Sequence, residues 1–186
     1  AYLTVASDNV TDTASAELRQ SLIVEGGKAY VVTASGVISS TAGPSLDPAV
    51  DSLQLLATEV NSMGPATNEA GIIVHHGSPD APVVDAFVAN TPVSLADDAS
   101  YKDFTPINNV PAGSYPVRLT TADSSTTIGT FRADLGTADA DTVIVFASGF
   151  ADSANANDYG NGLQLRAHFV DASDKTVESS RNLPSL

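Results

Sequence analysis

One short stretch of this chain holds several residues that could perform chemistry. It contains two adjacent histidines, His75 and His76, followed by Asp80 and Asp85. Imidazole and carboxylate groups bind zinc, but typical zinc sites need three or four converging ligands. Adjacent residues of a strand point to opposite faces, so His75 and His76 cannot both bind one ion without distortion. The better interpretation is that Asp80 and Asp85 accept backbone N–H bonds and cap a turn.

A second candidate site is a loop rich in oxygen atoms after residue 151. Its candidate calcium ligands are Asp152, Asn155, Asn157 and Asp158. The formal net charge of −14 favours cations and repels nucleic-acid phosphates, so we expect no nucleic-acid partner. The loop lacks the glycine and terminal glutamate of an EF-hand. We therefore expect no cofactor, with a structural calcium ion as the alternative.

No nucleophile or carboxylate pair stands in a catalytic pattern. Ser78 is followed by proline and lacks the Gly-x-Ser-x-Gly setting of a nucleophile elbow. Asp97 and Asp98 are adjacent, but they lie in a stretch that reads as a loop. The chain has no Trp, 5 Tyr and 6 Phe, which weakens a sugar-stacking module. We expect a protein that is not an enzyme.

The stretch that carries the histidines reads as a strand, a tight turn and a second strand. Apolar, β-branched runs at 72–74 and 83–88 flank a turn whose glycine and two prolines exclude a helix. The turn residues to which we assign a structural role are Ser78, Pro79, Asp80, Pro82 and Asp85.

The composition is that of sheet and turn. Hydrophobic residues make up 42% of the chain, enough for a core, while Lys and Arg together number 8. The absence of cysteine excludes disulfides and cysteine zinc sites. No run approaches the roughly 18 apolar residues of a membrane-spanning helix, and no signal peptide opens the sequence.

Part of the sequence is repeated. Residues 2–36 match residues 115–149 without a gap, including Ala34-Ser35-Gly36 on Ala147-Ser148-Gly149. Residues 53–57 match 163–167 at a spacing shorter by three, a change that the loop between residues 40 and 53 can absorb. Alternation at 115–120, 131–135 and 163–169, and a continuous apolar run at 143–146, predict the strands of the second copy.

These strands predict an all-β fold of tandem Ig-like antiparallel β-sandwiches of about seven strands, with the first sandwich incomplete at its N-terminus. Residues 1–62 form a partial first repeat with its C-terminal strands only, 63–70 a linker, and 71–186 a complete second sandwich. The first copy has no counterpart of residues 71–113. Truncation, completion by another subunit, or a rearranged first domain each account for this.

The turn and its flanking strands, Ile73 to Val88, resemble the opening motif of the DUF4397 family, roughly V-H-A-S-P-D-A-P-x-V-D-V-Y-V. Val110-Pro111-Ala112-Gly113-Ser114-Tyr115 is similar to that family's V-P-A-G-x-Y turn. The resemblance covers about residues 71–172, and it departs from the family at His76-Gly77. It implies an exported or surface-attached prokaryotic protein with an Ig-like sandwich, often in tandem, and no assigned activity.

We therefore expect a non-enzymatic extracellular or cell-surface module, structural or adhesive, in a surface protein or fibre. It would associate by strand complementation with other copies of itself or with the rest of a longer parent chain. The predicted association edge comprises Tyr2, Leu3, Val5, Val31 and Val32. The alternative is a calcium-dependent carbohydrate-binding module with a surface glycan as its ligand.

Overall fold

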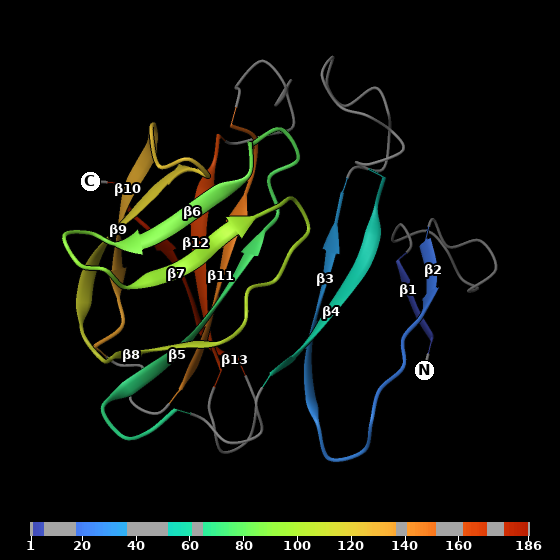
Figure 1. Ribbon diagram of the computed structural model, residues 1–186. Helices are drawn as coiled ribbons and strands as arrows, with labels where there is room; N and C mark the ends of the chain where they lie inside the picture. Colours follow the sequence, from blue (N-terminus) through green and yellow to red (C-terminus); the bar gives the residue numbers. More distant parts are fainter. Residues whose placement is uncertain are drawn as a thin grey trace. The chain divides into compact units, whose positions relative to one another are not determined.

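The computed structural model describes residues 2–5, 18–36, 52–60, 65–136, 141–151, 162–170 and 177–185. These residues form strands and connecting segments and no helix, so the predicted all-β class is confirmed. The chain divides into two compact units, Ala1–Ser62 and Met63–Leu186, and each has its own sheets (Figure 1).

The second unit has nine described strands in two sheets. The four-stranded sheet has the order β10-β9-β6-β7, formed by β10 (Thr127–Asp134), β9 (Ser114–Thr121), β6 (Val84–Val88) and β7 (Ser94–Ala99). The five-stranded sheet has the order β13-β12-β11-β5-β8, formed by β13 (Val177–Leu183), β12 (Gln164–Val170), β11 (Thr142–Ser148), β5 (Glu69–His76) and β8 (Asn108–Pro111).

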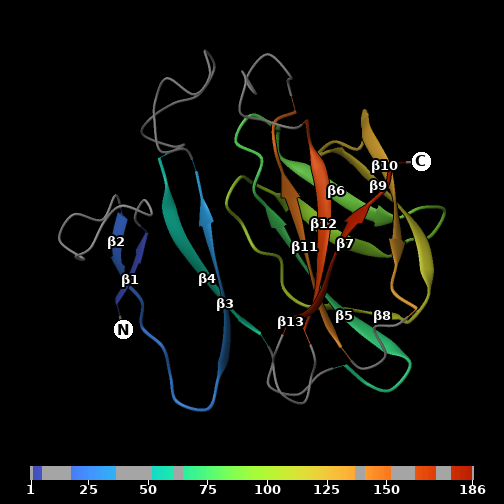
Figure 2. The same cartoon turned by 180° about the vertical axis from the view of Figure 1, so that it is seen from behind.

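The core of this unit lies between its two sheets, which Figures 1 and 2 show from opposite sides. In β9, Val117 and Leu119 are buried while Arg118 between them is exposed, as the predicted alternation requires. They meet side chains of the other sheet, including Val143 and Phe169. Side chains of both layers thus form one continuous core, as in a β-sandwich.

The expected antiparallel pairing is wrong at one place. β5 and β11 pair in parallel, with Ile72 opposite Val143 and Val74 opposite Val145. The chain leaves β5, builds β6, β7, β9 and β10 in other positions, and returns to the same sheet in the same direction. Both strands are nearly continuously buried, which is typical of parallel neighbours covered on both faces.

The edges of the sandwich are closed or blunted. Beyond β13, the Arg132 N–H donates to the carbonyl oxygen of Pro184 at 2.9 Å, so the end of the chain joins β10 (Figure 2). At the opposite edges, β7 carries the exposed Asp97 and Asp98 and an irregular register, and β8 is short and ends at Pro111. Charges, irregular register and proline all discourage pairing with a further strand.

The turn before β9 is fixed by a tyrosine. The Tyr115 hydroxyl donates to the carbonyl oxygen of Pro111 at 2.6 Å, four residues upstream, in the manner of a tyrosine corner. A Cβ atom at Gly113 would lie 2.8 Å from that hydroxyl oxygen. The Val-Pro-Ala-Gly-Ser-Tyr motif therefore needs its tyrosine for this hydrogen bond and its glycine to leave room for the hydroxyl.

The described residues of the first unit form two separate two-stranded sheets. One pairs β1 (Tyr2–Val5) with β2 (Leu18–Ser21), and the other pairs β3 (Ala29–Ser35) with β4 (Gln54–Val60). The Gln20 amide links them, since it donates to the Leu55 carbonyl oxygen at 2.8 Å and accepts from the Leu55 N–H at 3.1 Å.

Two details of the chain differ from the expected boundaries. Glu69 and Ala70, expected in the linker, are the first residues of β5, and Ala70 is fully buried opposite Val110. Small residues beside Asn and Pro suggested a linker, but the neighbouring β8 extends the ladder to them. Strand β13 was not expected because its sequence, Val-Glu-Ser-Ser-Arg-Asn-Leu, has no apolar alternation.

We predict that Tyr115→Phe lowers the free energy of unfolding by about 1 kcal/mol, because it removes one hydrogen bond. Gly113→Ala should destabilise the chain further by displacing the hydroxyl. The two effects should be less than additive in the double variant, since removing the hydroxyl removes part of the clash. Urea unfolding of the four proteins measures this, and strict additivity would contradict it.

Candidate functional site

The two histidines lie on β5 with their side chains on opposite faces, as strand geometry requires. Both are buried, with His75 2% and His76 1% exposed. His76 points into the core between the sheets, whereas His75 lies on the outward face of the five-stranded sheet. They are therefore placed in two different environments and share no ligand.

Both ring nitrogens of His76 bind the turn that follows it. Nε2 lies 3.0 Å from the carbonyl oxygen of Pro82 and donates to it, and Nδ1 accepts the Ser78 N–H at 3.4 Å. This arrangement requires the neutral ring with its proton on Nε2. His76 thus holds the turn from inside, and neither nitrogen is directed toward a ligand.

Asp80 ties the turn to the end of β11. Its Oδ1 accepts the Ala151 N–H at 2.7 Å and the Ser78 hydroxyl at 3.3 Å. Beside it, the Gly77 N–H donates to the Ala147 carbonyl oxygen at 2.8 Å, and a Cβ atom at Gly77 would lie 2.9 Å from that oxygen. Residue 77 therefore has to be glycine for the turn to approach β11 so closely.

Asp85 ties the start of β6 to two other segments. The carboxylate is buried, and its Oδ1 accepts the Asp98 N–H of β7 at 2.9 Å. Its Oδ2 accepts the Ser124 hydroxyl, from the turn between β9 and β10, at 3.2 Å. The turn before β6 is held as well, because Ala122 donates its N–H to the Val83 carbonyl oxygen at 3.1 Å.

The structure thus brings the expected turn residues together as a set of structural anchors, which we call the corner: His76, Ser78, Pro79, Asp80, Pro82 and Asp85. The carboxylates do cap backbone N–H groups, as expected. These N–H groups, however, belong to strands and loops at other places in the sequence. Ser124 and Ala151, which complete the corner, carry no local signal in the sequence. Asp80 and Asp85 join the corner to distant segments, whereas Ser78 bonds within the turn itself.

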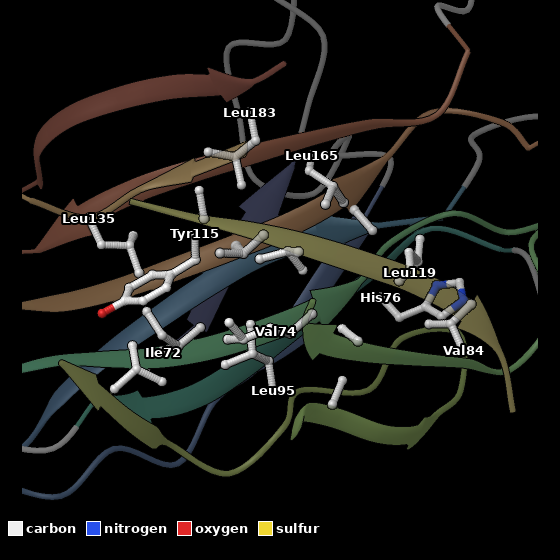
Figure 3. Close-up of a pocket in the computed structure, with 18 residues that line it drawn as sticks. Ile72, Val74, His76, Val84, Leu95, Tyr115, Leu119, Leu135, Leu165 and Leu183 are labelled. Atoms are coloured by element: carbon white, nitrogen blue, oxygen red, sulfur yellow. The ribbon is translucent and has the colours of Figure 1, made fainter. Parts of the chain in front are cut away.

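A small cavity lies in the core beside the corner (Figure 3). Aliphatic side chains of both sheets line it, together with the rings of His76 and Tyr115. Its volume is about 30 Å³, whereas sites for small organic ligands hold about 300 Å³ or more. The cavity is therefore a packing gap among aliphatic core residues and leaves no room for a substrate.

On the outward face of the five-stranded sheet, His75 is part of a row of rings. It stacks on Phe104 with the centroids 4.3 Å apart and meets the edge of Phe146 at 5.5 Å, and Phe146 contacts His168 at 5.1 Å. Its Nδ1 donates to the Asp103 carbonyl oxygen at 3.0 Å. Burial lowers the pKa of His75 below its ordinary 6.5, against the smaller opposing effect of that carbonyl group.

The metal hypotheses divide into those inside and those outside the described residues. Among the described residues, no three His, Cys, Asp or Glu side chains come together to hold an ion, so His76, Asp80 and Asp85 form no such group. The candidate calcium ligands Asp152, Asn155, Asn157 and Asp158 lie outside the described residues. Calcium at that loop stays a prediction.

The predicted association edge falls on two different sheets. Tyr2, Leu3 and Val5 lie in β1, whose backbone is paired with β2. Val31 and Val32 lie in β3, which pairs with β4 on one side; among the described strands none pairs with its other edge. β1 likewise has one edge with no partner among the described strands, so both parts of the prediction stay candidates for adding a strand.

The β3-β4 ladder reproduces the β11-β12 ladder residue by residue. Ser35 pairs with Gln54 and Ala29 with Val60, and their repeat counterparts pair likewise, Ser148 with Gln164 and Thr142 with Val170. No residue is inserted or lost in either ladder between these ends. The two segments that match in sequence thus also share one register.

Burial differs sharply between the two ladders. Val145, Ala147 and Ala167 face the core of the second unit and are 8%, 4% and 0% exposed. Their counterparts are exposed, Val32 by 37% together with Ala34 and Ala57, and we call these three residues the open face. Side chains that lie beneath a facing sheet in the second unit are thus exposed at the equivalent positions of the first unit, where no described sheet covers them.

The geometry defines an all-β sandwich domain, preceded by a smaller β unit, whose most distinctive polar residues hold its segments together. Residues 70–160 match the model of the DUF4397 family, described as a domain of unknown function. This part of the chain is therefore a DUF4397 domain, and the family prediction is confirmed. No curated protein and no solved structure gives a significant match. The described residues include no helix that could span a membrane.

We predict that Asp85→Ala lowers the free energy of unfolding by about 2 kcal/mol, because the Asp98 N–H loses its acceptor inside the protein. Asp85→Asn keeps an acceptor oxygen and should recover part of the loss. Asp97→Ala, on the exposed surface of β7, serves as the control and should change stability by less than about 0.5 kcal/mol. Equal losses at both aspartates would contradict the anchoring role.

We also predict that acid destabilises the chain through His75. Because its pKa is lowered in the folded state, the unfolded chain binds a proton below about pH 6.5 that the folded chain does not. The free energy of unfolding should therefore fall by up to about 1.4 kcal/mol per pH unit, from about pH 6.5 down to the lowered pKa. Above that pH His75 is neutral in both states and contributes no slope.

Urea unfolding between about pH 5 and pH 7.5 measures this slope. The control is His75→Asn, which can still donate to the Asp103 carbonyl oxygen but does not titrate. The two proteins are compared by slope, because the substitution also changes packing against Phe104 and Phe146. Identical slopes would contradict the prediction.

Proposed function

We propose that this chain is a non-enzymatic structural or adhesive module of an extracellular or cell-surface protein or fibre. In this proposal residues 1–62 are part of a first Ig-like repeat, residues 71–186 are the complete second repeat, and added strands complete the first. The observation that carries the proposal is the shared register of β3-β4 and β11-β12 together with the exposed open face.

The corner supports a structural role. Its carboxylates bind backbone N–H and hydroxyl groups of other segments, and both nitrogens of His76 are engaged. A catalytic acid or base needs a proton partner in a substrate, within reach and beside a space where substrate can sit. Residues that bind only other parts of the fold, beside a cavity of about 30 Å³, favour support over catalysis.

The contrast between the edges of the two units supports assembly. The sheet edges of the second unit are protected from pairing with a further strand. Their protection comes from aspartates, an irregular register, Pro111 and the chain end that joins β10. In β3, an edge with no described partner lies next to the exposed Val32. A sheet edge beside apolar side chains is a template for another strand.

The alternative proposal is a calcium-dependent carbohydrate-binding module, and only the composition of the 152–158 loop favours it. Calorimetry with calcium, followed by glycan binding with and without a chelator, separates the two proposals. Heat from calcium together with chelator-sensitive glycan binding would favour the alternative.

We predict that the 186-residue chain associates as its concentration rises, and that Val32→Asp raises the concentration needed at least several-fold. A charge on the open face opposes the burial that association requires. Val93→Asp is the matched control, since Val93 is 40% exposed and lies in the second unit. Light scattering and sedimentation measure the effect. A well-folded chain that stays monomeric at high concentration would contradict the assembly proposed here.

A further inference from the structure

We infer that the open edge of β3 accepts a strand of the β5 type, supplied by another polypeptide and running parallel to β3. This inference rests on the proposed function, because it names the partner of the same edge. The partner is an extended, β-branched apolar segment of about six residues, similar to Gly71–His76 of this chain. It would extend the sheet beside the open face, as β5 extends the sheet beside β11 in the second unit.

The second unit provides the template for the register. β11, the counterpart of β3, pairs with β5 so that Val143 lies opposite Ile72, Val145 opposite Val74 and Ala147 opposite His76. Transferred through the repeat, the corresponding positions of β3 are Tyr30, Val32 and Ala34. The transfer is sound because β3-β4 and β11-β12 share the same register along their whole length.

The side chains of the open face fit such a partner. In the second unit Val74 and Val145 are adjacent on the core face and both are 8% exposed. In the first unit Val32 has no such neighbour and is 37% exposed. The other end of this face is polar, where Glu59 replaces Phe169 and its carboxylate binds the Lys28 ammonium at 2.9 Å. An added strand is therefore expected to pack most closely near Val32 and Ala34.

A second copy of this chain cannot donate its own β5. The first half of that strand pairs with β8, and the second half is paired by the segment after β7. There Lys102 donates its N–H to the His76 carbonyl oxygen at 2.7 Å, and Thr105 donates to that of Val74 at 2.8 Å. Releasing β5 would break both rows of bonds and expose Ile72 and Val74, so the donor is a strand that is not already folded into a sandwich.

The test uses the complete chain and a synthetic peptide of residues 69–78 with a lysine tail for solubility. The chain has no cysteine, so introduced thiols are its only ones. One protein variant carries Tyr30→Cys and another Ala34→Cys, and the peptide carries Ile72→Cys or His76→Cys. Oxidised glutathione serves as the oxidant, and the rate of protein–peptide disulfide formation is measured.

Parallel pairing in the inferred register joins residue 30 to residue 72 and residue 34 to residue 76. These two combinations should react at least about ten-fold faster than the crossed ones. In the crossed combinations the Cα atoms are about 13 Å apart along the strands, beyond the roughly 7 Å that a disulfide spans. Faster crossed reactions would show antiparallel pairing, and equal rates would show no register; either result overturns the inference.

Two controls and one alternative design complete the experiment. Val93→Cys reports the background rate of a half-exposed thiol in the second unit, and Val32→Asp combined with Ala34→Cys should abolish the fast reaction. If Tyr30→Cys does not fold, Ala34→Cys with peptides bearing cysteine at 72, 74 or 76 decides the register, and only position 76 supports the inference. Disulfide dimers of the protein forming faster than peptide adducts would overturn it in favour of a second copy.

The inference and the proposed function can fail separately. The peptide without cysteine should suppress the concentration-dependent association of the chain. If the chain still associates but forms no disulfide adduct with the peptide, the proposed function stands and the inference of a β5-type partner is overturned. Adducts in the inferred register without self-association support the partner and contradict assembly of identical copies.

Discussion

A strand buried on both faces must have both of its edges paired, and this constraint governs the second unit. β5 is such a strand, with nearly every residue buried and β11 along one edge. Its other edge needs β8 for one half and the segment after β7 for the other. Unpaired backbone groups at that depth would each cost about 1–3 kcal/mol, so the neighbouring loops are held in place.

The corner follows from the same constraint. The chain leaves the buried end of β5 here and crosses to the other sheet, and His76, Ser78 and Asp85 are buried at this crossing, so their polar groups need partners in the protein. His76, Asp80 and Asp85 supply donors and acceptors to three different segments at this point. The family motif is thus explained by the bonds that hold the chain in place where it changes sheets.

Much of the second unit could be predicted from sequence, because its signals are local. The alternation of β9, the apolar run of β11 and the turn after His76 each lie within about ten residues. The parallel pairing of β5 with β11 and the contact from Asp80 to Ala151 join residues some 70 positions apart, and no local pattern records them. Strand β13 has a polar sequence, so its strand conformation comes from pairing with its neighbours. For the first unit the repeat predicted the strands, while their pairing and the exposure of Val32 appear only in three dimensions.

The directions of the first and last strands of the second unit have a mechanical consequence. β5 is parallel to β11, and β11, β12 and β13 alternate in direction, so β5 and β13 point the same way. The chain therefore enters this sheet at one end and leaves it at the other. A pulling force applied between Glu69 and Leu183 would slide the strands lengthwise and load their perpendicular hydrogen bonds together, in shear. If both termini lay at the same end of the sheet, the same force would break the hydrogen bonds of the ladder one after another.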